Sequence, residues 1–292
     1  MAIPSADQVL FDGLLDLGGG LLRSYGSEAV GSGIARRMHA LAMRDPRTYV
    51  DYCLTIRDEH TILLGQVLNH TTWFFRDPGS WVRLSALLMA RYDPPLAHPR
   101  HRPLRAWSAG CSTGEEAYTL AIVLAEAIGP GALADVAGFR VFATDLSEEC
   151  IKVAREGRYP ADSMGHVPED IRQRYFTLHG GTLSARAELR SAICFARHDL
   201  LCDPPFRGMD VVSCRNVLPH LLPGAQARVL ACLYCAVDSL GFVFVGSSDS
   251  PGAESALLET VSRLDRIYRP RPELQRRVQM GLFASLSVKR LG

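Results

Sequence analysis

The stretch AWSAGCSTGEEAYTLAIVLAEAIG, residues 106–129, decides the fold class of this chain. A strand-like run ends in a glycine-containing turn, and a long apolar helical segment follows at once. A strand joined to a helix by such a turn is typical of an α/β sheet. Here, however, Glu115 and Glu116 stand at the start of the helix, where a nucleotide-binding turn would receive a phosphate.

The two glutamates argue against a phosphate-binding turn. The turn is not GxGxxG, and it lacks the Lys-Ser/Thr pair of a P-loop. At an effective dielectric constant of about 20, unit charges about 4 Å apart interact by roughly 4 kcal/mol, so the carboxylates would repel a diphosphate. The turn therefore favours a ligand with a cationic or amino group.

The rest of the chain predicts a parallel sheet. Helical segments such as SEECIKVAREG separate the strands, with Ser147 as a plausible N-cap and Gly157 as the stop. Alternation of this kind predicts an α/β fold with right-handed crossovers. The expected strands are residues 104–110, 139–145, 209–217 and 241–249.

Changes of pattern along the chain suggest its domains. Residues 1–90 show helical spacing of apolar residues, and 91–103 form a proline-rich linker. Residues 104–270 form the α/β domain, in which 168–196 interrupt the alternation and predict a small β insertion. Residues 271–292 are a basic tail.

Composition and charge exclude several classes of function. The chain has 32 basic and 31 acidic side chains, a formal net charge of +1, so no global field attracts nucleic acid or an anionic membrane. No apolar run approaches the ~20 residues of a membrane span, and the first residues do not resemble a signal peptide. We expect a cytoplasmic protein without membrane insertion. Cys232 and Cys235 lie in an apolar helical stretch, which favours a core position, and we expect no metal site.

A second acidic residue narrows the ligand further. Asp145 ends the strand that follows the glycine turn, and ligands of open α/β sheets bind at such strand ends. A carboxylate there can accept the two hydroxyls of a ribose. A ribonucleoside that carries an amino acid and a positively charged sulfur meets both demands. The predicted ligand is S-adenosylmethionine, with S-adenosylhomocysteine as the product.

Several motifs together resemble the CheR-type methyltransferases, which methylate glutamates of chemotaxis receptors with S-adenosylmethionine. The resemblance covers roughly residues 10–270 and includes the segment Thr72 to Arg76, which looks like the family's active-site motif. It implies a Rossmann-like class I methyltransferase domain, an all-helical N-terminal domain and a small β-subdomain. The motifs that carry it are WSAGCSTGEEAYTLAI, FATDLSEECIKVAREGRYP, VPEDIRQRYF, FARHDLL, DVVSCRNVLPHL and GFVFVGSSDS.

The resemblance also implies roles for individual residues. Glu116 would bind the amino group of the methionine part, Asp145 the ribose, and Asp199 with Leu200 the adenine. Thr72 and Arg76 would close the methionine end, whereas Arg215 and Asn216 would line the methyl-transfer side. The full set of implied cofactor contacts is His70, Thr72, Arg76, Gly110, Glu116, Asp145, Asp199, Leu200, Arg215 and Asn216, and the implied catalytic residues are Arg76 and His220.

The acceptor half of the pattern departs from the family. His220 stands where the family commonly has Tyr, and the predicted second helix holds few basic residues. The sequence thus leaves two acceptors open: a protein glutamate, as on a receptor, or a small molecule, for which His220 could serve as a base. A binding protein without turnover is a third possibility. A nucleic-acid amino-methyltransferase is disfavoured, because the DPPF sequence at 203–206 precedes its strand instead of following it.

Overall fold

The computed structural model describes residues 11–16, 20–56, 58–68, 71–92, 102–129, 131–133, 138–249 and 256–274. It divides into two compact units: Met1–Asn69 with Leu218–Gln226, and His70–Val217 with Ala227–Gly292. The sequence-based boundary at residue 90 differs from this division, since α5 (Pro78–Tyr92) belongs to the second unit. Below, the two are called the helical unit and the sheet unit.

The helical unit contains η1 (Leu21–Ser24), α2 (Ser27–Ala40), α3 (Pro46–Thr55) and α4 (Glu59–Val67). Helices α2 and α4 pack closely at Gly33, where a Cβ atom would lie 2.7 Å from Cγ2 of Val67. Glu59 is buried and accepts two hydrogen bonds from the Arg37 guanidinium, at 2.7 and 2.9 Å. The phenol of Tyr49 donates a third, at 3.0 Å. This buried cluster joins all three helices.

A segment far along the chain completes the helical unit. It begins with η3 (Leu218–His220) and continues to Gln226, within α10 (Pro223–Ala236). Tyr25 and Leu221 form an isolated antiparallel bridge, and the Gly26 N–H donates to the carbonyl of His220 at 3.4 Å. The unit is therefore built from two stretches of sequence.

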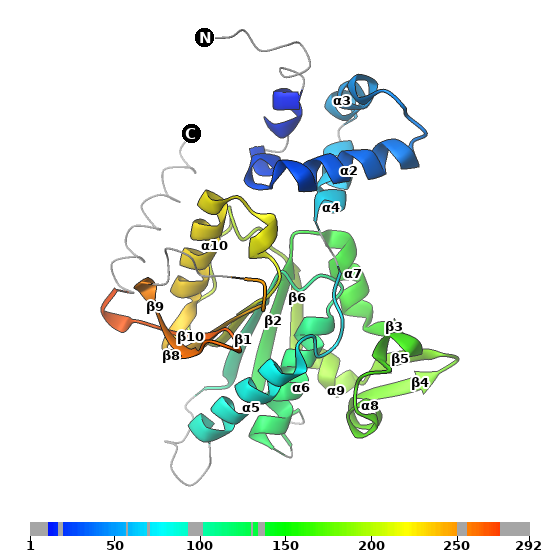
Figure 1. Ribbon diagram of the computed structural model, residues 1–292. Helices are drawn as coiled ribbons and strands as arrows, with labels where there is room; N and C mark the ends of the chain where they lie inside the picture. The colour runs from blue at the N-terminus through cyan, green and yellow to red at the C-terminus, as the bar shows by residue number, and fades with distance from the viewer. Residues whose placement is uncertain are drawn as a thin grey trace. The chain divides into compact units, whose positions relative to one another are not determined.

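The sheet unit is organised around a seven-stranded sheet in the order β6-β2-β1-β7-β8-β10-β9 (Figure 1). The first five strands are parallel, and β10 pairs antiparallel with both of its neighbours, β8 and β9. The predicted Rossmann-like α/β fold is confirmed. The strands are β1 (Leu104–Ala109), β2 (Phe139–Asp145), β6 (Ile193–Arg197), β7 (Met209–Cys214), β8 (Val237–Val245), β9 (Leu258–Ser262) and β10 (Ile267–Pro270).

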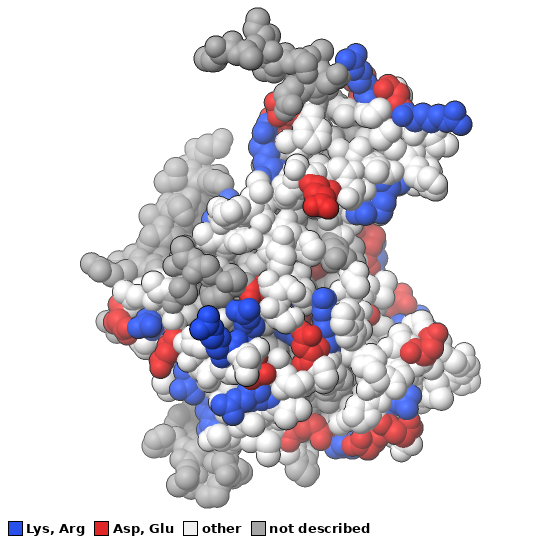
Figure 2. Space-filling view, in the orientation of Figure 1, with Lys and Arg blue, Asp and Glu red and all other residues white. Residues whose placement is uncertain are grey.

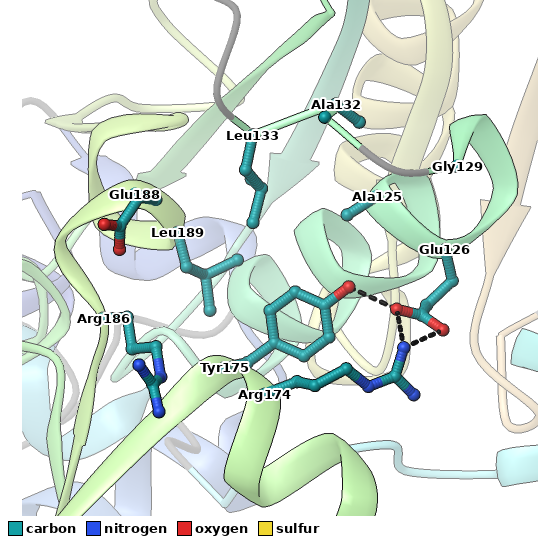
Figure 3. Close-up of a pocket in the computed structure, with 11 residues that line it drawn as sticks. Ala125, Glu126, Gly129, Ala132, Leu133, Arg174, Tyr175, Arg186, Glu188 and Leu189 are labelled. Atoms are coloured by element: carbon teal, nitrogen blue, oxygen red, sulfur yellow. Dashed lines mark hydrogen bonds and ion pairs between the residues drawn. The ribbon is translucent and has the colours of Figure 1, made fainter.

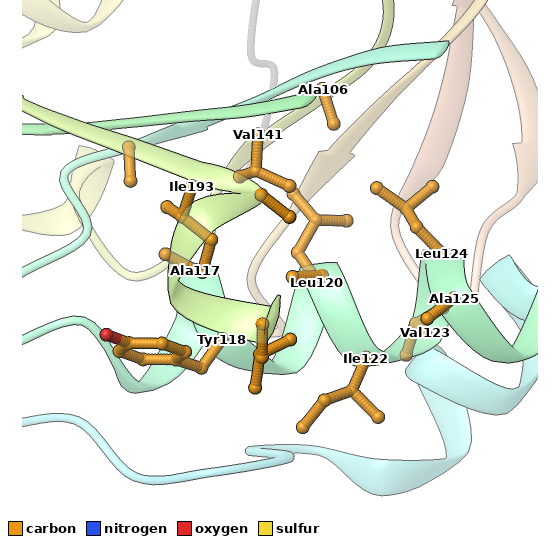
Figure 4. Packing of buried hydrophobic residues seen from close by; sticks show 14 of the residues in the cluster. Ala106, Ala117, Tyr118, Leu120, Ile122, Val123, Leu124, Ala125, Val141 and Ile193 are labelled. Atoms are coloured by element: carbon orange, nitrogen blue, oxygen red, sulfur yellow. The ribbon is translucent and has the colours of Figure 1, made fainter. Parts of the chain in front are cut away.

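Helix α6 (Glu115–Ile128) is the core of this unit. Its sequence is apolar around most of its circumference, as expected of a helix covered on several sides. Figure 4 shows Leu120 of α6 among Ala106, Val141 and Ile193, which come from three neighbouring strands. Burial of a leucine stabilises a fold by about 1.5–3 kcal/mol, so this contact helps to fix α6 against the sheet.

A small antiparallel sheet stands beside the large one in Figure 1. Its strands are β3 (Arg158–Pro160), β5 (Thr182–Ala185) and β4 (Phe176–His179), in that order. Against it pack η2 (Ala161–Met164) and α8 (Glu169–Tyr175), whereas α7 (Glu148–Glu156) and α9 (Ala187–Ser191) contact β6 of the large sheet. This sheet begins ten residues before the predicted insertion, and the last part of the insertion instead belongs to β6 of the large sheet.

The surface carries both signs of charge. On the face seen in Figure 2, basic and acidic side chains are interspersed, in keeping with the near-zero net charge. Within the described ranges, no helix combines the length and apolar character needed to cross a bilayer.

Candidate functional site

Three neighbouring strands of the sheet unit end beside one another. Strand β1 lies between β2 and β7 and is parallel to both, with Ala109 opposite Thr144 and Ser108 opposite Ser213. The residues that follow these strands must therefore meet at one edge of the sheet. They include Gly110, Asp145 and Arg215, which the sequence analysis placed in one site.

The glycine turn after β1 is held by the end of β2. The N–H groups of Gly110 and Cys111 both donate to the carbonyl of Thr144, at 2.8 and 2.9 Å. Gly110 has a φ of +76°, and a Cβ there would lie 2.6 Å from Cγ2 of Val217. Gly114 has a φ of +101°, a region that favours glycine. The turn thus needs glycine for conformation and for close packing.

Glu116 lies in the first turn of α6, behind the glycine turn. Its Oε1 accepts hydrogen bonds from the hydroxyls of Ser108, at 2.9 Å, and Ser213, at 2.8 Å. Burial raises the pKa of Glu116, and the positive charge of Arg215 opposes that rise. Its Oε2 has no hydrogen-bond partner in the described part of the chain. Glu116 therefore offers one free carboxylate oxygen to a positively charged group.

The neighbouring glutamate has a different environment. The Oε2 of Glu115 accepts a hydrogen bond from the hydroxyl of Thr113 at 2.7 Å, within the turn itself. Burial raises its pKa as well. Of the two glutamates that the sequence places at this helix start, only Glu116 bonds to residues of β1 and β7.

Asp145 is buried, with 8% of its surface exposed, and it already braces two backbone segments. Its Oδ2 accepts from the N–H of Ser112 at 2.8 Å, and its Oδ1 accepts from the N–H of Ser147 at 2.9 Å. An ionised carboxylate can accept about four hydrogen bonds, so each oxygen keeps capacity for one more. Asp145 can hold the glycine turn and still accept both hydroxyls of a diol.

Asp199 and Leu200 follow β6, the edge strand next to β2. The N–H of His198 donates to the carbonyl of Asp145 at 3.0 Å, which brings this segment to the end of β2. Oδ1 of Asp199 accepts from the N–H of Leu201 at 2.8 Å. The DPPF sequence lies nearby and is exposed or half-buried, with the Phe206 ring 5.0 Å from that of Trp107.

The segment before α5 contributes Thr72 and Arg76. The guanidinium of Arg76 lies over the ring of Trp73, 4.3 Å from its centroid, and Nη1 donates to the carbonyl of Thr71 at 3.2 Å. The Phe75 N–H donates to the hydroxyl of Thr119 on α6 at 3.0 Å, which fixes this segment to the sheet unit. Thr72 is half-buried. His70 lies outside the described residues.

Arg215 and Asn216 follow β7 and are bound by two acidic residues that the sequence analysis did not identify. Arg215 Nη2 donates to Oδ2 of Asp77 at 2.7 Å. Asp249 is buried, and its Oδ2 accepts from the N–H groups of Asn216 and Gly246, at 2.5 and 2.7 Å. Asn216 has a φ of +59°. Asp77 directly follows the segment Thr72 to Arg76, and Asp249 lies inside the motif GFVFVGSSDS. These positions were the only sign in the sequence that the two acids belong to the site.

His220 belongs to η3 and hence to the helical unit. Its carbonyl accepts from the N–H of Gly26, also of that unit. The role of His220 on the acceptor side stays a prediction.

A cavity of about 610 Å³ lies at the C-terminal end of α6, whereas Glu116 lies at the N-terminal end (Figure 3). Glu126 there accepts hydrogen bonds from Arg174 and from the Tyr175 phenol, so its charge is already compensated. Glu116 lies ten residues earlier on the helix, about 15 Å along its axis. This cavity is therefore separate from the strand-end site. In the described ranges, no three His, Cys, Asp or Glu residues are grouped to hold a metal ion.

The arrangement at the strand ends fits a ligand with an ammonium group, at Glu116, and a diol, at Asp145. Comparison with known families gives the same answer: the model of the family described as CheR methyltransferase, SAM binding domain, matches residues 70–264. The chain belongs to the CheR methyltransferase family. This CheR chain is a methyltransferase that uses S-adenosylmethionine, as the sequence analysis predicted.

Similar curated proteins include chemotaxis enzymes. The CheR chain is 38% identical over 222 residues to an "Uncharacterized 104.1 kDa protein in hypE 3'region" of Rhodobacter capsulatus, covering 74% of the chain but only 22% of that relative. It is 28% identical to "Chemotaxis protein methyltransferase 2" of Pseudomonas aeruginosa, covering 84% of the chain and 85% of the relative. It is 29% identical to "Chemotaxis protein methyltransferase" of Escherichia coli, covering 79% of each.

Solved structures resemble the chain only weakly. A TehB-like SAM-dependent methyltransferase from Corynebacterium glutamicum gives a TM-score of 0.36 at 16% identity, covering 66% of the chain and 96% of that structure. PKMT2 from Rickettsia typhi in complex with AdoHcy gives 0.35 at 14% identity, covering 60% and 26%. The family assignment rests on the sequence match and not on these structures.

Proposed function

We propose that this CheR chain transfers a methyl group from S-adenosylmethionine to the side-chain carboxylate of a protein glutamate. The observation that carries the proposal is that two cations, Arg76 and Arg215, lie close enough for their charges to interact, and that Arg215 directly follows β7. Cations in that position suit an anionic acceptor. The names of the E. coli and P. aeruginosa relatives support a protein as the acceptor.

Different residues of the site would bind different parts of the proposed ligand. The free oxygen of Glu116 would take the ammonium group of the methionine part, and Asp145 would take the ribose hydroxyls. The residues after β6 would contact the adenine, and the segment before α5 would close the methionine end. The residues proposed to bind the cofactor are His70, Thr72, Arg76, Gly110, Glu116, Asp145, Asp199, Leu200, Arg215 and Asn216.

The proposed methyl transfer requires little proton transfer by the protein. When bound, S-adenosylmethionine supplies a methyl group on a positively charged sulfur. A glutamate carboxylate is already ionised near neutral pH, so an oxygen lone pair can form the new C–O bond while the C–S pair departs with sulfur. No general base is required. Alignment of the reacting atoms and exclusion of water can lower such a barrier by ~7–11 kcal/mol.

A second candidate is methylation of a small molecule, favoured by His220 at a position where the family commonly has Tyr. If the acceptor were an amine or hydroxyl, a proton would have to leave, and His220 could accept it. The substitution His220→Tyr tests this idea, because it should alter acceptor selectivity. Unchanged selectivity would exclude His220 as a specificity residue.

The deciding experiment incubates the protein with methyl-labelled S-adenosylmethionine and host lysate. Label on protein that is released by mild alkali would identify a methyl ester, as the proposal expects. Label confined to the small-molecule fraction would contradict the proposal and favour the second candidate. Arg76→Ala should reduce the transfer rate far more than it lowers the melting temperature.

A further inference from the structure

The guanidinium of Arg215 is buried against two aromatic rings that pack edge-to-face on each other. Its side chain is 2% exposed, and its central carbon lies 5.1 Å from the centroid of the Trp81 ring and 4.7 Å from that of Phe244. Among the described residues, its one ion-pair partner is Asp77, which accepts from Nη2 at 2.7 Å. The rings limit the movement of the guanidinium on one side, and the hydrogen bond to Asp77 restricts its rotation.

One donor of this buried cation is unused. The Nε–H of Arg215 is buried and has no hydrogen-bond partner within the described part of the chain. Nearly all buried polar groups in proteins are paired, and an exception calls for an explanation. Arginine presents its N–H donors in a fixed planar fork, so fixing Nη2 also fixes the direction of Nε. This remaining N–H donor is therefore suited to bind an anion.

Asp77 is itself held in an unusual conformation. It has a φ of +56°, and Phe75 two residues earlier has a φ of +51°, values rare for residues with a side chain. Oδ2 of Asp77 also accepts a hydrogen bond from the hydroxyl of Ser247 at 3.2 Å. A single carboxylate oxygen thus joins the segment before α5, the end of β7 and the residues after β8. Strain of this kind is concentrated at functional sites.

We propose that Asp77 is a positioning residue, which holds Arg215 so that its Nε–H is presented to the carboxylate of the methyl acceptor. The proposal rests on the proposed function, because it takes the acceptor to be a carboxylate. Asp77 itself does not contact the acceptor. It neutralises part of the charge of Arg215, and it selects one orientation of the guanidinium.

The test is a double-mutant cycle at this pair. Asp77→Asn keeps the shape of the side chain and removes its charge, and Arg215→Lys keeps the charge and removes the planar fork. Rates are measured as alkali-labile methyl label on lysate protein at saturating S-adenosylmethionine. Calorimetry with S-adenosylhomocysteine measures cofactor binding, and thermal unfolding confirms that each variant is folded.

Each single substitution should slow transfer by about 100-fold, the usual effect of a small misplacement in an active site. The double variant should be no slower than Arg215→Lys to within about threefold, because Asp77 acts through Arg215. Affinity for S-adenosylhomocysteine should stay within about threefold of that of the wild type in Asp77→Asn, because Asp77 is not among the residues proposed to bind the cofactor. Asp77→Glu, which retains the charge, should restore at least about a tenth of the wild-type rate. Ser247→Ala is the matched control, and it should remain within about threefold of the wild-type rate.

Four results would overturn the inference. A wild-type rate in Asp77→Asn would exclude a positioning role, and losses that multiply in the double variant would indicate independent roles. A loss of S-adenosylhomocysteine affinity in Asp77→Asn equal to its loss of rate would show that the pair serves the cofactor and not the acceptor. If the wild-type protein itself gave no alkali-labile protein label, the proposed function would fail, and the carboxylate ligand of Arg215 with it.

Discussion

Replacing Glu116 by Gln should weaken cofactor binding while it stabilises the free protein. The substitution retains an oxygen that can accept the hydroxyls of Ser108 and Ser213, now bound at 2.9 and 2.8 Å. It removes the negative charge, which burial disfavours, as the raised pKa of Glu116 indicates. The negative charge of Glu116 therefore favours cofactor binding but lowers the stability of the free protein.

The size of the effect on binding follows from one interaction. The free Oε2 would bind the ammonium group, and a hydrogen bond to a charged group contributes about 1.5–3 kcal/mol. Its loss should raise the Kd for S-adenosylhomocysteine by about 10- to 150-fold. The unbound variant should melt above the wild type near neutral pH, because the wild type pays the cost of a buried charge there.

The dependence on pH has a definite sign. A carboxyl with a raised pKa in the folded state favours folding below its ordinary value of 4.5 and loses that contribution as pH rises through the raised value. For binding the sign is opposite, because a proton on Glu116 competes with the ammonium group. Affinity of the wild type should fall as pH is lowered through the raised pKa, and that part of the pH dependence should vanish in Glu116→Gln.

Calorimetry with S-adenosylhomocysteine and thermal unfolding over a range of pH measure both effects. Glu115→Gln is the matched control, since Glu115 is the adjacent residue, has a pKa raised by the same cause, and bonds to Thr113. Its affinity should stay within about threefold of that of the wild type. If Glu116→Gln bound as tightly as the wild type, or if Glu115→Gln lost as much affinity, the assignment of the ammonium to Glu116 would be refuted.

Three further substitutions test other parts of the structure. Asp145→Ala removes a carboxylate that braces two backbone N–H groups and would hold the ribose, so calorimetry should show at least about 100-fold weaker binding, and intact affinity would mean that the site is misassigned. Gly114→Ala should lower the free energy of unfolding, measured in urea, by about 1–3 kcal/mol. Its Cβ would lie 2.9 Å from the phenol oxygen of Tyr159, and the residue has a φ of +101°. An unfolding free energy equal to that of the wild type would contradict this packing. Glu59→Gln should cost about 3–5 kcal/mol near neutral pH by breaking a buried pair with Arg37. Since Arg37 lowers the pKa of Glu59, the wild type should hold this contribution above about pH 4.5 and lose it as pH falls through the lowered value, and a pH-independent difference between the two proteins would argue against the pair.

The sequence predicted the fold class and the placement of Glu116 and Asp145 near the ends of neighbouring strands, because parallel strands end at one edge of a sheet. Strand ends can be read from local apolar runs followed by polar residues. The start of β8 was harder to predict from the sequence. Residues 237–240 continue an apolar helical pattern, yet they belong to the strand, and short apolar runs do not distinguish the two.

Asp77 and Asp249 were missed for a different reason. Asp77 is 138 residues from its partner Arg215, and Asp249 is 33 residues from Asn216. Pairing over such distances depends on the folded path of the chain, and a left-handed φ at a residue other than glycine leaves no mark in composition. The two-part make-up of the helical unit escaped prediction for the same reason.

That two-part make-up has a consequence for how the protein is synthesised. Leu218–Gln226 leaves the ribosome long after Asn69, and at roughly 5–20 residues per second the delay is on the order of ten seconds or more. Throughout that interval the nascent N-terminal helices lack the backbone partners that Leu222 and His220 later supply to Ser24 and Gly26. An expression fragment that stops at residue 69 would carry the same defect permanently, so exchanges of this unit between homologues should transplant both stretches together.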